Sequence, residues 1–275
     1  MTESGSTSTR SDRLPSALEP HLPHGIAKPI LRTEAVFLDY DGTLTPIVER
    51  PELAILSDSV RRVVRRLSET CPVTIVTGRD VDVVRELVAI EGLGYVGSHG
   101  LDVVGPFASG LRHQAAEGFG PELDAVESAL RRRTDGIQGV FIERKRFSIS
   151  THVRQVDPRW HLRVETIVDE LRRAHPTLRR EGGKMLYELR PDIDWDKGAA
   201  VQWLLDGMGI DPSKALYLGD DLTDETVFAA LAGHGATVIV ADIEDRRPTG
   251  AQFRLNDHDD VQTLLEGLVV HRSHT

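Results

Sequence analysis

Residues 35–43 read AVFLDYDGT, four apolar residues that run directly into an Asp-x-Asp-Gly turn. A short, continuous apolar run of this kind is typical of a strand that is buried on both faces of a parallel sheet. Open α/β sheets bind their ligands beyond the carboxyl ends of such strands, and Asp39 and Asp41 stand at that place in the sequence. This stretch therefore predicts both the class of the fold and the edge of the sheet at which a site lies.

The alternation of buried strands and amphipathic helices continues on both sides of a different middle segment. Helical spacing is clear at 60–67, where apolar residues recur at i, i+3, i+4 and i+7, and a second buried run follows at 73–76. Further strands are expected at 95–96, 101–104, 215–218 and 237–240, and further helices at 81–88, 201–208, 227–231 and 261–268. Strands that alternate with helices predict a doubly wound, Rossmann-like α/β core.

The middle of the chain has another pattern. Helical stripes at 123–130 and 160–171, with strand-like segments at 140–143, 147–151 and 185–189, give the order helix–strand–strand–helix–strand. This order predicts a small α+β domain inserted into the core. We expect a disordered tail over residues 1–30, a core made of residues 31–108 and 190–275, and an inserted domain of residues 109–189.

The composition limits the class of protein. The chain has 275 residues and a formal net charge of −10. An acidic balance argues against a nucleic-acid-binding protein, and no apolar run reaches the roughly 18–20 residues that span a bilayer. The single Cys71 excludes an intrachain disulfide, and residues 1–10 lack the apolar stretch of a signal peptide. We therefore expect a cytoplasmic protein with neither nucleic acid nor membrane as a partner.

Reactive side chains stand at four strand ends or helix starts of the predicted core, which should meet at one edge of the sheet. They are Asp39 and Asp41, Thr77-Gly78-Arg79, Asp196-Lys197-Gly198, and Asp220, Asp221 and Asp224. Carboxylates that cluster in one cleft cost free energy unless a cation neutralises them. Because the clustered aspartates offer only oxygen ligands, the pattern favours Mg²⁺ over Zn²⁺. A calcium loop that begins at Asp39 is excluded, since its twelfth position is Arg50 rather than Glu.

Two carboxylates separated by one residue can divide the work of phosphoryl transfer. One binds the metal and attacks, while the other exchanges a proton. Lys197 and Mg²⁺ would supply positive charge at the transition state, and Thr77 with the backbone N–H of Gly78 would donate hydrogen bonds to phosphoryl oxygens. A dinucleotide-binding site is excluded, because GLGYVG at 92–97 follows a helix and precedes a strand, the reverse of the required order.

The four motifs resemble those of the haloacid-dehalogenase-like (HAD-like) phosphatases, and the insert resembles the C2-type cap of that superfamily. More narrowly, the chain is similar to the trehalose-6-phosphate phosphatases. The narrower resemblance is carried by ERKRFSISTHVR at 143–154, GKMLYELRP at 183–191 and His99-Gly100. Val153 and Asp102 stand where this family usually has Tyr and Glu, and these departures bear on substrate contacts more than on the reaction.

The resemblance implies a catalytic role for four residues. Asp39 would be the nucleophile that forms an aspartyl-phosphate. Asp41 would protonate the leaving sugar oxygen and then activate water. Thr77 and Lys197 would bind the phosphoryl group.

The resemblance also implies the binding residues. The Mg²⁺ site would be formed by Asp39, Asp41 (through its backbone carbonyl), Asp220, Asp221 and Asp224. The substrate would be bound by Gly78, Arg79, His99, Glu143, Lys145, Ser148, His152, Arg154, Lys184, Glu188 and Arg190.

The function implied is the Mg²⁺-dependent hydrolysis of trehalose 6-phosphate to trehalose and phosphate. Two alternatives stay open. One is a phosphatase for another sugar phosphate, such as sucrose phosphate, glucosylglycerate phosphate or mannosylglycerate phosphate. The other is a non-catalytic module that binds a sugar phosphate and regulates a partner. A small sugar phosphate is the expected ligand in each case, while a monomeric state and association with a trehalose-phosphate synthase are left open.

Overall fold

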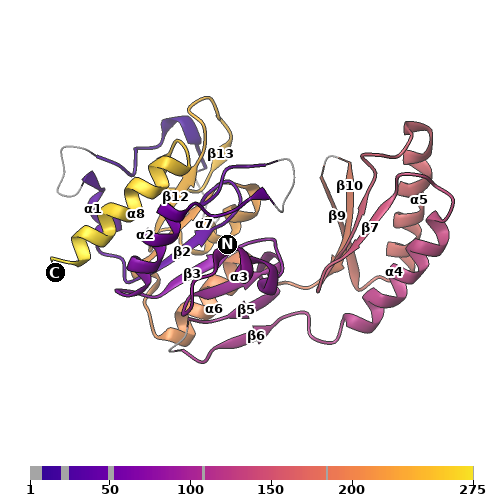
Figure 1. The fold of residues 1–275 in the computed structure, drawn as a ribbon, viewed down its shortest axis with the longest axis horizontal. Coiled ribbons are helices and arrows are strands. Elements are labelled where there is room, and N and C mark those ends of the chain that lie inside the picture. Colours follow the sequence, from indigo (N-terminus) through magenta and orange to yellow (C-terminus); the bar gives the residue numbers. More distant parts are fainter. Residues whose placement is uncertain (1–7, 20–24, 49–52, 107–108, 184, 275) are drawn as a thin grey trace, which may run out of the picture. The chain divides into compact units, whose positions relative to one another are not determined.

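The computed structural model describes residues 8–19, 25–48, 53–106, 109–183 and 185–274. The chain divides into two compact units (Figure 1), one formed by Met1–His113 with Trp195–Thr275 and the other by Gln114–Asp194. The boundaries expected at 108/109 and 189/190 lie five residues before the observed ones. The difference arises because residues just after 109 still belong to the sheet of the first unit, and the last strand of the second unit runs to Pro191.

The first unit is built on one eight-stranded sheet. Its strands are β2 (Ala35–Asp39), β3 (Val73–Val76), β4 (Gly94–Gly97), β5 (Asp102–Val104), β6 (Arg112–Gln114), β11 (Ala215–Gly219), β12 (Ala236–Val240) and β14 (Phe253–Leu255). They lie in the order β14-β12-β11-β2-β3-β4-β5-β6. Neighbours are parallel from β14 to β4, whereas β4 and β5 are antiparallel. The strand that carries Asp39 thus lies in the middle of the sheet, between strands from both pieces of the chain.

Helices cover both faces of this sheet. They are α1 (Lys28–Leu31), α2 (Asp58–Ser68), α3 (Val81–Val88), α6 (Lys197–Met208), α7 (Glu225–Ala230) and α8 (His258–Arg272). Helices α2, α3 and α8 pack with Val36 and Leu38 on one face, whereas α6 and α7 pack with Ala35 and Phe37 on the other. Alternate residues of β2 therefore enter two different cores, which explains why the strand is an unbroken apolar run. The predicted doubly wound α/β core is confirmed.

The N-terminal segment differs from its prediction. A disordered tail is the wrong expectation for residues 8–19 and 25–30. Within them, β1 (Thr9–Arg10) pairs with β13 (Pro248–Thr249), and Ala17, Ile26 and Ile30 are fully buried in the core. These apolar residues are too widely spaced to form a periodic pattern, so only tertiary packing gives them a role. Residues 1–7 and 20–24 lie outside the described residues.

The second unit is a four-stranded antiparallel sheet with two helices on one face (Figure 1). Its elements are α4 (Gly120–Thr134), β7 (Phe141–Arg144), β8 (Ile149–His152), α5 (Pro158–Ala174), β9 (Leu178–Gly183) and β10 (Leu186–Pro191), and the strand order is β7-β8-β10-β9. Ile142, Ile149 and Leu189 point to the helices and form a core with them. Strand β9 was not predicted, because its sequence LRREGG has no apolar alternation and it forms by pairing with β10 along its whole length.

Four 3-10 helices complete the described structure: η1 (Ser11–Arg13), η4 (Ser98–Gly100), η5 (Pro212–Lys214) and η6 (Leu222–Asp224). Within the part of the chain that the structure describes, no helix is both long enough and apolar enough to cross a membrane.

Candidate active site

Three neighbouring parallel strands end at the same edge of the sheet and bring the predicted motifs together. Strand β2 ends at Asp39, Thr77 follows β3, and Asp220 follows β11. The register aligns these ends, since Asp39 lies opposite Val76 of β3 and Leu38 lies opposite Leu218 of β11. The position of the site is therefore a direct consequence of the parallel sheet.

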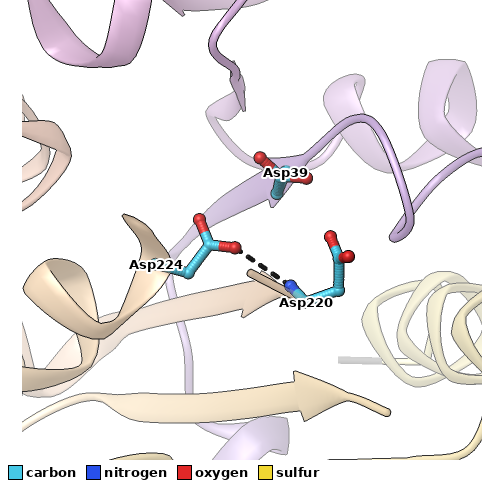
Figure 2. Close-up of side chains that lie close together, drawn as sticks. All are labelled: Asp39, Asp220 and Asp224. Atoms are coloured by element: carbon cyan, nitrogen blue, oxygen red, sulfur yellow. Dashed lines mark hydrogen bonds between the residues drawn. The ribbon is translucent and has the colours of Figure 1, made fainter. Parts of the chain in front are cut away.

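Three aspartates form a compact acidic cluster at this edge (Figure 2). Each of Asp39, Asp220 and Asp224 offers one carboxylate oxygen that lies within 4.8 Å of the others. Asp39 is 4 % exposed and Asp224 is fully buried. Among the described residues, this is the one group of three or more Asp, Glu, His or Cys side chains that could hold a metal ion together.

Lys197 lies between two of these carboxylates. Its Nζ donates hydrogen bonds of 2.7 Å to Oδ1 of Asp39 and of 2.7 Å to Oδ1 of Asp224. Lys197 is the first residue of α6, and the preceding Asp196 caps the helix by accepting a hydrogen bond from the backbone N–H of Ala199. The helix start thus fixes the base of the lysine side chain.

The close approach and burial of the three carboxyl groups raise the pKa values of Asp39 and Asp220. Burial, the largest cause, raises the pKa of Asp39 well above its ordinary value; Lys197 opposes this, and Asp224 and Asp220 add to it. Burial together with Asp224 and Asp221 raises the pKa of Asp220 to about 7. Burial lowers the pKa of Lys197, but Asp39 and Asp224 outweigh it and raise that pKa, so the side chain stays an ammonium. Three carboxylates against one ammonium leave a charge that a divalent cation would neutralise.

The hydrogen bonds divide the three aspartates into two kinds. Asp224 accepts from Lys197 Nζ and Tyr217 Oη on Oδ1, at 2.7 and 2.6 Å. Its Oδ2 accepts from the backbone N–H groups of Asp220 and Asp221, at 3.0 and 2.9 Å. A carboxylate has about four lone-pair sites, so those of Asp224 are filled by four donors.

Asp39 and Asp220 keep free acceptor sites. The one hydrogen bond described for the Asp39 carboxylate goes to Oδ1, and Asp220 accepts one from Thr43 at 3.3 Å, also on Oδ1. Asp221 is exposed and caps η6 by accepting from the backbone N–H of Leu222. Asp39 and Asp220 are therefore the carboxylates with room for a cation, while Asp224 orients Lys197 and the backbone around Asp220.

Gly42 lets the first motif approach this cluster. Its φ is +89°, and a Cβ built there would lie 2.1 Å from Oδ2 of Asp220. Only glycine combines this left-handed conformation with so close an approach. The turn after Asp41 is thus shaped around the Asp220 carboxylate.

Arg79 contacts Asp41, the second aspartate of the first motif. Its Nε and Nη2 donate to the two oxygens of the Asp41 carboxylate at 2.7 and 2.5 Å, and its guanidinium lies over the ring of Tyr40. The hydrogen bond with Asp41 is the largest cause that raises the pKa of Arg79. The structure therefore places Arg79, expected to bind substrate, on the residue expected to exchange protons.

Thr77, Gly78 and His99 lie together beside these groups. Thr77 is 1 % exposed, and its Oγ1 accepts a hydrogen bond from the backbone N–H of Arg79 at 3.2 Å. A Cβ at Gly78 would lie 2.5 Å from Cε1 of His99, so the imidazole packs directly on the glycine backbone. The loop after β3 is tightly packed at the place where the sequence predicts contacts with a phosphoryl group.

In the second unit, predicted residues gather on the sheet face without helices. Glu188 Oε1 accepts hydrogen bonds from Ser148, Ser150 and Lys145, at 2.5, 3.2 and 3.3 Å. These side chains alternate along the strands with those that point to α4 and α5. They form a polar network in which the acceptor is a carboxylate.

A second pair lies on the same face. His152 Nε2 and Glu143 Oε2 are 3.0 Å apart, on the neighbouring strands β8 and β7. The ring of Phe141 lies against His152, with 5.3 Å between the centroids. The face thus combines charged groups with an exposed aromatic ring.

The remaining predicted residues of this unit have varied positions. Arg190 is 8 % exposed and pairs with Glu181 of β9 at 2.7 Å, and Arg179 pairs with the same carboxylate at 3.0 Å. Glu181 and Arg179 were not predicted as site residues, because β9 itself was not predicted. The available signal was their spacing of two residues in the segment Arg179–Glu181, which places both side chains on one face of a strand. Arg154 is exposed after β8, and Lys184 lies outside the described residues.

Most of the chain matches one known protein family. The trehalose-phosphatase family matches residues 37–259 of the chain.

The chain belongs to the trehalose-phosphatase family.

The curated relatives of the chain are named as trehalose-phosphate phosphatases, which are phosphoric monoester hydrolases. Probable trehalose-phosphate phosphatase D of Arabidopsis thaliana is 39% identical over 248 residues, which cover 85% of this chain and 66% of the relative. The trehalose-phosphate phosphatase of Mycobacterium bovis is 36% identical over 264 residues, 94% of this chain and 66% of the relative. The chain thus spans about two thirds of the length of these relatives.

Solved structures agree with this assignment. The trehalose-6-phosphate phosphatase of Aspergillus fumigatus is 30% identical with a TM-score of 0.64, over 95% of this chain and 100% of that one. The C-terminal domain of the C. albicans trehalose-6-phosphate phosphatase is 25% identical with a TM-score of 0.68, over 94% and 98%. A haloacid dehalogenase-like hydrolase from Bacteroides thetaiotaomicron, 13% identical with a TM-score of 0.60, shares the fold. The predicted resemblance and the HAD-like fold are confirmed.

Proposed function

We propose that this chain is a trehalose-6-phosphate phosphatase that uses Mg²⁺ and forms a phosphoryl intermediate on Asp39. The observation that carries the proposal is the geometry at Asp39. Its buried carboxylate ends the central strand, has Lys197 Nζ at 2.7 Å, and lies in one cluster with Asp220. Membership of the trehalose-phosphatase family supplies the substrate class.

The donor set suits Mg²⁺. Asp39 and Asp220 offer hard oxygen ligands, and the charge of the cluster calls for a divalent ion. When bound, Mg²⁺ would supply positive charge to a phosphoryl group that gains negative charge in the transition state. Asp224 and Lys197 would hold the ligands in place around it.

The proposed reaction has two displacements. Oδ of Asp39 attacks the phosphorus, and the bond from phosphorus to the sugar oxygen breaks as Asp41 gives that oxygen its proton. Asp41 then takes a proton from water, whose oxygen attacks the phosphorus of the aspartyl-phosphate. Phosphate leaves, and both aspartates return to their starting states. Lys197, Thr77 and the backbone N–H of Gly78 would bind the phosphoryl oxygens.

We also propose that the polar face of the second unit binds the sugar. Glu188, Glu143 and His152 offer acceptors for hydroxyl groups, and Lys145 offers a donor. Carboxylates surrounded by donors are held in fixed orientations, which favours one arrangement of sugar hydroxyls over another. This would make the second unit the source of substrate specificity.

Phosphate release from a panel of sugar phosphates tests the proposal. The panel contains trehalose 6-phosphate, sucrose 6-phosphate, glucosylglycerate phosphate and mannosylglycerate phosphate, each with Mg²⁺ or with EDTA. Trehalose 6-phosphate should be the best substrate, and EDTA should abolish its turnover. If another sugar phosphate is turned over at least about a hundredfold better, equivalent to roughly 3 kcal/mol of preference, the trehalose assignment is wrong.

The intermediate is tested separately with Asp39→Asn and the matched variant Asp58→Asn on α2. Acid quenching of the reaction should trap phosphate on the wild-type protein and on Asp58→Asn but not on Asp39→Asn. Unchanged phosphate release by Asp39→Asn would exclude the covalent mechanism.

A further inference from the structure

The turn Ser98–Gly100 has an unusual backbone. Ser98 and His99 have φ angles of +49° and +57°, and Gly100 follows with +106°. Residues with side chains rarely adopt this region, and they persist in it only where the surroundings hold them. Two such residues in succession, beside a catalytic centre, indicate a turn whose shape is imposed by its contacts.

One side of this turn supports the loop after β3. The backbone N–H of Ser98 donates to the carbonyl of Arg79 at 2.7 Å, and that of His99 donates to the carbonyl of Thr77 at 3.1 Å. The hydroxyl of Ser98 donates to Asp80 Oδ1 at 2.6 Å. The turn therefore contacts the segment that carries Thr77 and Gly78 at three points.

The other side of the turn touches the start of α6. A Cβ at Gly100 would lie 2.4 Å from the carbonyl oxygen of Asp196 and 3.0 Å from the backbone nitrogen of Lys197. The backbones are thus in direct contact at the residue that presents its ammonium to Asp39. One short turn joins the two segments expected to bind the phosphoryl group.

The side chain of Trp195, two residues before the start of α6, also contacts this turn. Trp195 Nε1 donates a hydrogen bond of 2.8 Å to the carbonyl oxygen of Gly100. The indole is itself fixed by His113, whose ring centroid lies 4.7 Å away, and His113 stacks on Trp203 at 5.3 Å. Trp203 belongs to the same aromatic group, but no hydrogen bond of its indole nitrogen occurs among the described residues.

We propose that Trp195 is a positioning residue for phosphoryl transfer. Its indole N–H holds the carbonyl of Gly100 and thereby keeps the loop of Thr77 and Gly78 in register with Lys197. This inference rests on the proposed phosphatase function and adds to it a residue that touches neither the phosphate nor the sugar. Because its action is on the phosphoryl site, it should be felt equally by every phosphate ester, whatever the leaving group.

The test compares Trp195→Phe with Trp203→Phe. Phe keeps an aromatic ring at each position and removes the indole N–H. The values of kcat and KM are measured for trehalose 6-phosphate and for p-nitrophenyl phosphate, which lacks a sugar. Trp195→Phe should lower kcat by roughly 10–100-fold for both substrates, because a displacement of about 1 Å at a reacting centre has an effect of this size. Trp203→Phe should stay within about twofold of the wild type.

A second measurement does not depend on turnover. Binding of orthovanadate, a phosphate analogue, is followed by calorimetry in the presence of Mg²⁺. Trp195→Phe should weaken it by the same factor of at least about tenfold, whereas Trp203→Phe should leave it unchanged. Should Trp195→Phe fail to fold, 3-benzothienylalanine at position 195, which replaces the N–H by sulfur without a change of shape, gives the same comparison.

The outcomes are distinct. Equal effects of the two variants, or a loss confined to trehalose 6-phosphate, would overturn the role of Trp195. If the wild type hydrolyses the aryl phosphate but not trehalose 6-phosphate, the substrate proposal fails and Trp195 is still judged on the aryl phosphate. If the wild type hydrolyses neither, the enzymatic proposal fails and vanadate binding decides the role of Trp195.

Discussion

The guanidinium of Arg79 donates two hydrogen bonds to the carboxylate of Asp41, at 2.7 and 2.5 Å. The arginine side chain is 14% exposed and the aspartate side chain 43% exposed, so the less exposed partner fixes the more exposed one. A planar fork facing a carboxylate sets both the position and the plane of that carboxylate. Arg79 thus orients the group that, in the proposed mechanism, protonates the leaving sugar.

Replacement of Arg79 should affect substrates unequally. Arg79→Lys keeps the charge but loses the fork, so we expect kcat for trehalose 6-phosphate to fall by roughly 10–100-fold. The effect on p-nitrophenyl phosphate should be several times smaller, because nitrophenolate leaves without a proton. Steady-state kinetics with both substrates measures the ratio, and Arg62→Lys on α2 is the control. An equal loss on both substrates would show that Arg79 serves the phosphoryl group instead.

Asp220 should make the metal-free protein less stable as the pH rises. Its pKa is about 7 in the folded state against an ordinary value of 3.8, so the folded state binds more protons between these values. The free energy of unfolding should therefore fall from about pH 4 to about pH 7 and then level off, with a slope of at most about 1.4 kcal/mol per pH unit for this group. Asp39, whose pKa is also raised, acts in the same direction.

Thermal unfolding in EDTA from pH 5 to pH 9 checks this pH dependence. Asp220→Asn should flatten the curve and raise the Tm at pH 8, whereas Asp58→Asn at an exposed position of α2 should leave the curve as in the wild type. Added Mg²⁺ should raise the Tm of the wild type most at high pH. A wild-type curve that rises between pH 5 and pH 8 in EDTA would contradict the expectation.

Asp224→Asn should have the opposite effect on stability. The four groups that contact the Asp224 carboxylate are all donors, so the amide of Asn would place its NH₂ against one of them. With Lys197 left short of a charged partner, we expect a loss of about 3–5 kcal/mol in the free energy of unfolding. Urea unfolding of Asp224→Asn beside Asp220→Asn measures the contrast. If both variants shift the stability in the same direction, the assignment of Asp224 as the residue that orients Lys197, and of Asp220 as a ligand of the cation, is wrong.

Gly42→Ala should abolish activity for a local reason. The added methyl would occupy the place of Oδ2 of Asp220 and displace this carboxylate. Gly233→Ala is the matched control, since Gly233 also has a positive φ, +76°, but nothing within 4 Å. Both variants should lose about 1 kcal/mol of stability to backbone strain, but only Gly42→Ala should lose phosphate release, by more than about a hundredfold. Mg²⁺ titration of the Tm should show weakened binding for Gly42→Ala alone.

Glu188→Gln should separate recognition of the sugar from catalysis. The amide keeps the shape of the side chain but loses the charge that accepts from Ser148, Ser150 and Lys145. We expect kcat/KM for trehalose 6-phosphate to fall by roughly 10–100-fold, with p-nitrophenyl phosphate unaffected. Glu165→Gln, which faces Arg180, serves as the control. A loss on both substrates would place Glu188 outside sugar recognition.

The fold of the core was predictable because its central strands have a clear sequence pattern. A strand buried on both faces is an apolar run, and parallel order brings its carboxyl end to the same edge as its neighbours. From these two facts, the sequence alone predicts that Asp39, Thr77 and Asp220 lie together. The burial of Ile26 was not predictable, since an isolated apolar residue in a polar stretch has no periodicity, and β9 escaped because its residues pair through the backbone.

The roles within the site depended on contacts that sequence spacing does not contain. Arg79 follows Thr77-Gly78, which suggests a phosphate ligand, but its side chain turns to Asp41. Asp224 is one of three aspartates in a short motif, and only its four hydrogen-bond donors distinguish it from Asp220. Trp195 has no signal apart from its aromatic character, because its partner is a backbone carbonyl almost a hundred residues earlier.

The central position of β2 has a consequence for how this chain is made. Its neighbours are β3, translated soon afterwards, and β11, translated last of the three. At about 5–20 residues per second, the roughly 180 residues between Asp39 and Gly219 take on the order of 10–40 s to leave the ribosome. During that interval the edge of β2 that later pairs with β11 has no partner, and an unpaired strand edge is a template for aggregation. The inserted unit has its own core and can fold during this time. Until β11 is made, the growing polypeptide therefore needs protection only at the unpaired edge of β2.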